Sequence, residues 1–148
     1  MTEHSPLIVG TEELDSALAS ADRVYLAGHL EVPQTLLPHI DCAPEMGVSS
    51  YRNFTADKPH VHPCNIEFNY IAKGCTKLLV LQTGEEYELG AGSTFILPPG
   101  TPYATKSRAG TRVIFFKSPG GNDKQLVEVS RELAQWLSSW DAVYEVRP

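Results

Sequence analysis

The stretch PHVHPCNIEFNYIAKG, from Pro59 to Gly74, decides the fold. His60 and His62 are two residues apart, and side chains at positions i and i+2 of a strand share one face of the sheet. Residues 63–65 (PCN) favour a tight turn, after which Glu67 begins the next strand. We therefore expect two imidazoles and one carboxylate to lie close together.

These three side chains form a candidate metal site. Two histidines and one carboxylate on one side of a metal leave positions open for substrate or oxygen, an arrangement associated with non-haem Fe(II). Mn, Ni, Co and Zn accept the same ligands. We expect one divalent metal ion, with Fe(II) favoured, bound by His60, His62 and Glu67.

Around this stretch the sequence predicts many short strands. From Val48 to Lys117, β-branched and aromatic runs alternate with glycine and proline turns, a pattern typical of an all-β sandwich or barrel. The expected strands lie near residues 48–55, 58–62, 67–73, 76–81, 86–89, 93–97, 103–106 and 111–117.

A short N-terminal helix and a proline-rich arm precede the barrel. The segment TEELDSALASA begins with the hydroxyl of Thr11 as a cap, continues with acidic residues, and spaces Leu14 and Leu18 four apart. Three prolines between Gly28 and Gly47 then predict an extended, irregular arm, which could pack on a partner subunit.

An amphipathic helix is expected at the C-terminus, over about residues 123–140. It follows a flexible GGND turn, and its apolar residues recur at three- and four-residue spacing. These residues are Leu126, Val129, Leu133, Trp136 and Trp140. The whole chain, 1–148, is then one domain, with helix and arm at about 1–47 and the barrel at about 48–118.

Composition limits the class of partner and the compartment. The 148 residues carry a net charge of −6, which disfavours binding to nucleic acid. No apolar run approaches the roughly 20 residues that span a bilayer, and no basic residue precedes Arg23, so we expect no membrane segment and no secretory signal. The three cysteines form no C-x-x-C pair, which favours a reducing cytoplasm.

Two motifs resemble those of the cupin superfamily. The spacing H-x-H-x4-E-x6-G, from His60 to Gly74, is similar to the first cupin motif. The second, G-x5-P-x-G-x2-H, is matched by Gly92, Pro98 and Gly100, with Tyr103 in place of the final histidine. The resemblance implies a jelly-roll β-barrel around a metal site, in which typical cupins use that histidine as a third imidazole ligand.

Tyr103 is therefore a candidate metal ligand and a candidate catalytic residue. It could bind the metal as a phenolate, as in the ectoine synthases, which also look like cupins and carry a tyrosine after a similar turn. It could instead donate a hydrogen bond to substrate or act as a general acid or base. Finally, it could only fill the space of the missing imidazole.

Further candidates for contact with a substrate follow from strand parity. If Glu67 points into the barrel, Asn69 does so as well, either as a substrate or ligand contact or as a buried amide bonded to the backbone. Tyr51 and Lys77 lie on strands expected to line the cavity. His39, on the arm, could supply a nitrogen if the arm folds over the barrel mouth.

The resemblance implies several functions, because cupins serve as dioxygenases, isomerases, lyases and ligand sensors. We favour a metal-dependent enzyme for a small polar molecule, and among these a non-haem Fe(II) dioxygenase. A redox-neutral isomerase or lyase, in which Tyr103 moves the proton, is the alternative. A second alternative is a non-catalytic protein that binds a sugar or organic acid. The arm and the tryptophan-bearing helix favour a homodimer.

Overall fold

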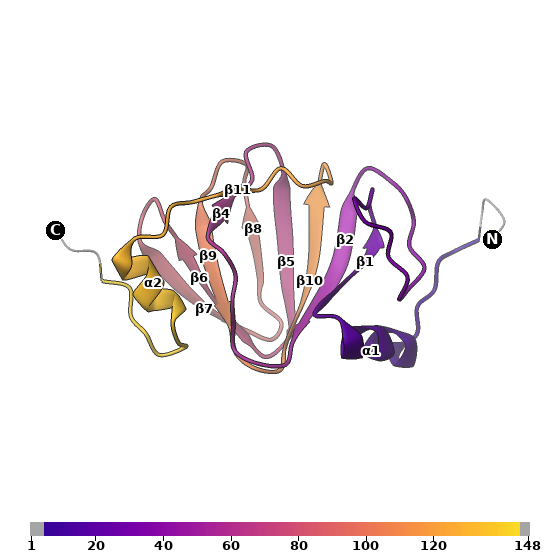
Figure 1. Ribbon diagram of the computed structural model, residues 1–148, viewed down its shortest axis with the longest axis horizontal. Coiled ribbons are helices and arrows are strands. Elements are labelled where there is room, and N and C mark those ends of the chain that lie inside the picture. The colour runs from indigo at the N-terminus through magenta and orange to yellow at the C-terminus, as the bar shows by residue number, and fades with distance from the viewer. Residues whose placement is uncertain (1–4, 146–148) are drawn as a thin grey trace.

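Two antiparallel sheets face each other in the computed structural model, which describes residues 5–145 (Figure 1). The first sheet contains, in spatial order, β1 (Arg23–Ala27), β2 (Glu45–Tyr51), β10 (Thr111–Ser118), β5 (Ile66–Lys73) and β8 (Thr94–Leu97). The second contains β11 (Gln125–Leu126), β4 (His60–Val61), β9 (Tyr103–Ser107), β6 (Cys75–Val80) and β7 (Glu85–Gly90), with β3 (Thr55–Ala56) paired to β9. The predicted all-β jelly roll with two short helices is confirmed.

The proline-rich arm is shorter than predicted, because β2 takes up its C-terminal end. Strand β1, which pairs antiparallel with β2, was not predicted, and β2 begins at Glu45 rather than Val48. Between them the arm follows the edge of β1: the side-chain amide of Gln34 bonds the backbone N and O of Tyr25 at 2.7 and 2.8 Å. A parallel bridge then joins Ala27 and Ile40. These bonds complete the edge of β1, the last strand of the first sheet.

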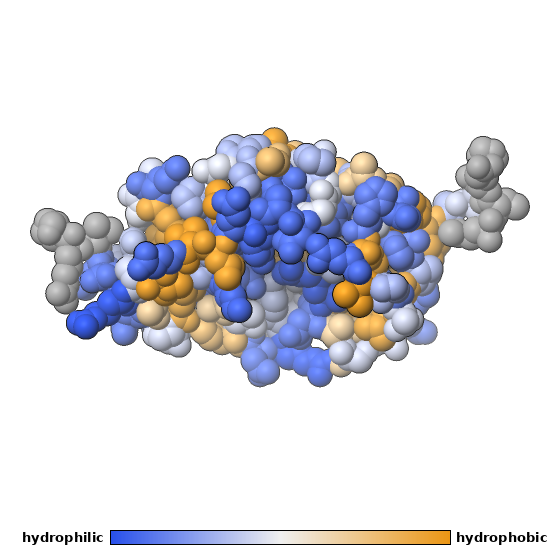
Figure 2. All heavy atoms as spheres, turned by 45° about the horizontal axis from the view of Figure 1, so that its top comes forward, coloured by the Kyte–Doolittle hydropathy of each residue, from blue (hydrophilic) through white to orange (hydrophobic). Residues whose placement is uncertain are grey.

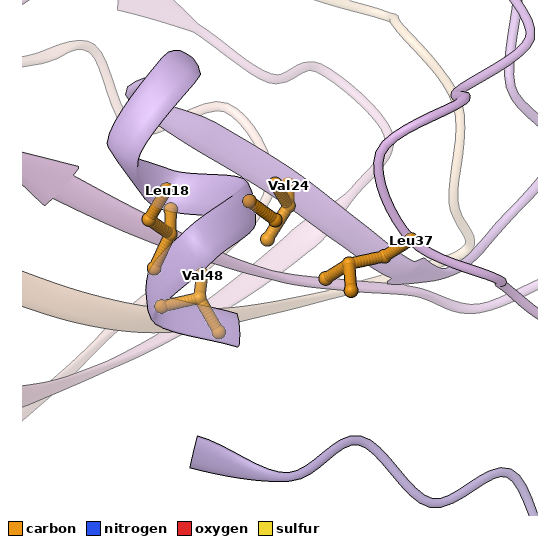
Figure 3. Close-up of a cluster of buried hydrophobic side chains, with 5 residues drawn as sticks. Leu18, Val24, Leu37 and Val48 are labelled. Atoms are coloured by element: carbon orange, nitrogen blue, oxygen red, sulfur yellow. The ribbon is translucent and has the colours of Figure 1, made fainter. Parts of the chain in front are cut away.

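Helix α1 (Thr11–Ser20) forms where it was predicted and covers the outer face of the first sheet. Its Leu18 points toward Val24 of β1 and Val48 of β2, and Leu37 of the arm closes the same apolar cluster (Figure 3). The predicted cap is wrong: Gly10 is the N-cap, no side chain caps the helix, and Thr11 is already its first helical residue.

Helix α2 (Arg131–Leu137) is much shorter than the predicted helix over 123–140. It begins at Ser130, whose hydroxyl accepts a hydrogen bond from the backbone N of Leu133 at 3.1 Å. Residues 123–130 are not helical, and Gln125 and Leu126 form β11, which pairs with β4 instead. Two apolar residues at helical spacing, Leu126 and Val129, are consequently exposed.

A buried lysine and a buried tryptophan fasten α2 to the outer face of the second sheet. Trp136 packs with Leu79 and Ala104, and its indole N donates to Glu86 at 2.8 Å. Lys106 of β9 is fully buried, and its Nζ donates to three backbone carbonyls in and after α2, those of Trp136, Ser139 and Ala142, at 2.8 to 2.9 Å. In Figure 1 the two helices therefore lie against opposite ends of the barrel. Within residues 5–145, neither helix has the length and apolar character needed to cross a bilayer.

Candidate metal centre

The two sheets and the arm enclose a cavity of about 490 Å³. Its walls are the inward side chains of both sheets, and arm residues 29–32 and residues 121–124 line it as well. Figure 2, which brings the top of the barrel forward, shows hydrophilic side chains gathered across the middle of this face, with apolar groups on both sides. A cavity of this size and polarity is suited to a small polar ligand.

His60, His62 and Glu67 come together in this cavity. One donor atom from each lies within 4.8 Å of the other two, and both histidines are buried, as metal ligands in an enclosed site must be. The short strand β4 carries His60, and His62 follows its last residue; β5 carries Glu67 beside them after the predicted turn. The expected convergence of two imidazoles and one carboxylate is therefore present.

Each imidazole is oriented by an acceptor at Nδ1. The Nδ1 of His60 lies 2.6 Å from the backbone O of Lys58, and the Nδ1 of His62 lies 2.6 Å from a carboxylate oxygen of Asp123. Because a carbonyl and a carboxylate only accept hydrogen bonds, both Nδ1 atoms carry the hydrogen. Both Nε2 atoms are thus directed toward Glu67 and Tyr103.

The two histidines differ in charge. Burial lowers the pKa of His60, which is neutral and accepts at Nε2 from the hydroxyl of Tyr103 at 2.8 Å. Burial alone would lower the pKa of His62 as well, but hydrogen bonds to Glu67 and Asp123 outweigh it and raise the pKa. The Nε2 of His62 lies 3.0 Å from a carboxylate oxygen of Glu67 and carries the second ring proton, so this imidazole is positively charged.

The donor set fits a divalent cation. A proton on His62 links the imidazole to Glu67 in this structure, and a cation would satisfy the same two atoms. The partners around the set are those of metal ligands: Asp123 and Lys58 fix the imidazoles, and the amide of Asn69 donates to Glu67 at 3.0 Å. Burial would raise the pKa of Glu67, but the bonds from His62 and Asn69 lower it and keep the carboxylate ionised.

Tyr103 completes this cluster from β9. Its hydroxyl lies 3.3 Å from each carboxylate oxygen of Glu67, in addition to the contact with His60. Burial, and then the charge of Glu67, raise the pKa of Tyr103 well above its ordinary value, so the side chain is a neutral phenol here. The position of the usual third imidazole therefore holds a hydroxyl with one transferable proton.

The remaining sequence candidates divide between the cavity and the surface. Asn69 and Tyr51 line the cavity, as parity predicted for Asn69. Lys77 does not, because its neighbour Thr76 faces inward; the lysine contacts the backbone O of Trp140 at 3.1 Å on the outer face. The arm does reach the cavity, yet it brings His29 there and not His39.

Asp123 is a part of the centre that sequence reasoning missed. Besides His62, its carboxylate bonds the backbone N of Cys64 at 2.9 Å and of Asn65 at 3.1 Å, which fixes the turn between the ligands. It stands 61 residues after His62 in a glycine-rich turn that resembles any other. No local pattern could have found it.

Known proteins agree with this fold. Residues 53–116 match the family model described as a cupin domain. A comparison with curated protein sequences gives no match.

Solved structures with the same fold have low sequence identity. KdgF from Halomonas sp. is 20% identical, with a TM-score of 0.52 over 68% of this chain and 80% of that one. The polyketide cyclase RemF from Streptomyces resistomycificus is 17% identical, with a TM-score of 0.52 over 63% and 66%. The nucleoside dehydratase PAC13 of Streptomyces is 15% identical, with a TM-score of 0.52 over 62% and 74%. Together with the facing sheets, these matches show that the chain has the fold of the cupin superfamily, a jelly-roll β-barrel.

Proposed function

We propose that this protein is a metal-dependent enzyme that isomerises a small polar molecule, or eliminates a group from it, without net oxidation. The observation that carries the proposal is the place of the Tyr103 hydroxyl, 2.8 Å from His60 and 3.3 Å from both oxygens of Glu67, inside the cavity. A protonated phenol inside a polar cavity is suited to general acid–base catalysis, because it can give its proton to a bound substrate and take it back.

His60, His62 and Glu67 would hold the divalent ion, and Asp123 and Asn69 keep them oriented. When bound, the ion supplies a Lewis acid that polarises a carbonyl, carboxylate or enolate oxygen of the substrate. Tyr103 gives or takes the proton at its hydroxyl. A cation beside this hydroxyl favours the phenolate, which brings the raised pKa back toward the range useful for catalysis.

A similar structure supports this choice of chemistry. PAC13 is a nucleoside dehydratase solved with uridine, and a dehydratase removes water without net oxidation. At 15% identity the likeness is one of fold, so it supports a polar small molecule as substrate and leaves the substrate itself open.

Oxygenation is the second candidate, because the same three metal ligands are also suited to it. Two imidazoles and one carboxylate are the ligands of many non-haem Fe(II) oxygenases. Oxygen uptake separates the two candidates: undiminished turnover under anaerobic conditions contradicts the dioxygenase. If the protein binds metal and a ligand but converts no compound in a panel of substrates, it is the non-catalytic binding protein.

Elemental analysis tests the metal site. The full chain is purified without added metal, loaded separately with Fe(II), Mn(II), Ni(II) and Zn(II), and desalted. We expect one bound ion per chain and a higher melting temperature with the preferred metal, and loss of both in His60→Ala. His39→Ala, which removes a histidine outside the cavity, is the control. Equally little metal in the wild type and in His60→Ala would contradict the proposal.

The homodimer predicted from the sequence needs a different surface from the one first considered. Trp136 is buried within its own chain and is not available to a partner. The outer face of the first sheet, by contrast, carries Met46, Phe116, Phe68 and Ile96 in one row across four neighbouring strands. We propose that a second copy covers this row. Light scattering should give a dimer for the wild type and a monomer for Phe116→Glu.

A further inference from the structure

Two cationic side chains face the cavity and have no anionic partner. Arg23 of β1 and Lys124, next to Asp123, both line it. Within residues 5–145, neither of them forms an ion pair with a carboxylate. Both residues are exposed at the wall of the cavity, where they can attract an anionic ligand without the cost of burying a charge.

The guanidinium of Arg23 is held in place rather than free to turn to solvent. Its Nε donates to the hydroxyl of Ser49 at 2.9 Å, and the group lies 5.1 Å from the ring centroid of Phe115. Tyr51 stands beside it on β2. A planar guanidinium fixed in this way can present parallel N–H groups to two oxygens of one ligand group.

The balance of charge around the two cations favours a ligand with one negative charge over a ligand with two. Lys117, the third cation of the cavity, is already paired with Glu45 at 2.9 Å. Asp57 lines the same region, and one of its oxygens accepts from Thr105 at 3.2 Å. Glu31 of the arm lines the cavity as well, so the two cations face two carboxylates outside the Lys117–Glu45 pair. Without an excess of positive charge, the cavity suits a monoanion better than a dianionic phosphate.

Lys124 also responds to the neighbouring charge. Burial first, and then the charge of Arg23, lower the pKa of Lys124. The two cations are therefore close enough to repel each other, and an anion between them would relieve that repulsion.

We propose that the substrate of this cavity carries a single carboxylate group, which Arg23 and Lys124 bind together. The inference rests on the proposed function, because it names the class of that enzyme's substrate as a small carboxylic acid. His60, His62, Glu67 and Tyr103 act on the rest of the molecule, and the two cations set its orientation in the cavity.

Titration of the full chain with sodium acetate tests this inference by NMR. The reporter is the Nε–H resonance of Arg23, assigned as the one lost in Arg23→Gln. We expect acetate to shift it saturably at constant ionic strength, with sodium chloride producing no such curve and inorganic phosphate binding more weakly. Lys124→Met should weaken acetate binding about fivefold, as expected for loss of one charged contact. Lys73→Met, which removes a lysine outside the cavity, should not change it.

Two results would overturn the inference: an Arg23 resonance that acetate does not shift saturably, or tighter binding of phosphate than of acetate. Metal content keeps this test separate from that of the proposed function. Arg23→Gln should bind metal as the wild type does, because Arg23 contacts none of the proposed ligands. A protein that binds acetate at Arg23 but no metal refutes the enzyme and leaves the carboxylate site standing.

Discussion

The two faces of β9 show how this molecule separates function from stability. All five residues of the strand are buried. Tyr103, Thr105 and Ser107 point into the cavity, whereas Ala104 and Lys106 point outward and are covered by the C-terminal segment. Burial alone therefore says nothing about the role of a residue here; the direction of the side chain decides it.

The polar groups on the two faces are satisfied in different ways. The Tyr103 hydroxyl contacts the side chains of His60 and Glu67, and each of these polar groups can bond a ligand instead. Lys106 has its three N–H groups bonded to three backbone carbonyls and has none left for a ligand. We expect changes on the cavity side to alter binding and changes on the outer side to alter folding.

The largest effect is expected on the outer side, from Trp136→Ala. This side chain is fully buried against Leu79, and its truncation should lower the free energy of unfolding by about 3–5 kcal/mol. Urea denaturation measures the loss, and the protein that remains folded should still bind metal. Trp140→Ala, which removes a half-buried ring beyond the helix, should cost less than half as much. Equal losses would show that α2 is not the anchor.

On the cavity side, Asp123→Asn should lower metal affinity about 10-fold to 100-fold, because the amide no longer fixes the Nδ1 hydrogen of His62 with a charge. Competition with a chelator measures the affinity. Asp41→Asn, which alters the carboxylate paired with His29 on the exposed arm, is the matched control. Unchanged affinity in Asp123→Asn would contradict the assigned role.

Stability should also depend on pH through Lys106. Burial, followed by the charge of Lys77, lowers the pKa of Lys106 from 10.5 to about 8. The unfolded chain keeps this proton up to its ordinary pKa, whereas the folded chain releases it from about pH 8 upward. The contribution of Lys106 to the free energy of unfolding therefore rises with pH across this window and is lowest below it. The difference between wild type and Lys106→Met, measured by urea denaturation from pH 7 to 10.5, should show this rise; a flat difference would contradict it.

The smallest change in metal binding is expected for Tyr103→Phe. If the hydroxyl moves a proton and does not bind the ion, metal affinity should stay within about threefold of the wild type. Loss of about tenfold or more would identify Tyr103 as a ligand and would remove the main support for proton transfer. Chelator competition decides between the two.

Sequence periodicity predicted the parts of the site that lie on or beside β4 and β5, which follow each other in the sequence. The i, i+2 spacing placed His60 and His62 on one face, and parity from Glu67 placed Asn69 in the cavity. Lys77 shows the limit of this reasoning. Strand β6 alternates as expected, but only its register with β9 decides whether Thr76 or Lys77 faces inward.

Residues brought in from distant segments could not be predicted. Asp123 and Lys124 lie where the sequence predicted the start of a helix, since residues 126 and 129 have helical spacing. Pairing of β11 with β4 outweighs that spacing, because the hydrogen bonds of the sheet edge and of the Asp123 carboxylate form only in the extended conformation. Arg23 was missed because β1, five residues long, directly follows a helix.

The arm between β1 and β2 has a consequence for how this protein can diversify. It is held by the amide of Gln34 and by the bridge at Ile40, and residues 29–32, which line the cavity, lie before both attachments. Val32 among them is largely exposed and makes little contribution to the core. This short segment can thus accept new side chains, or change length, without disturbing either sheet. We expect selection for a different substrate to change residues 29–32 first and to leave the two sheets unchanged.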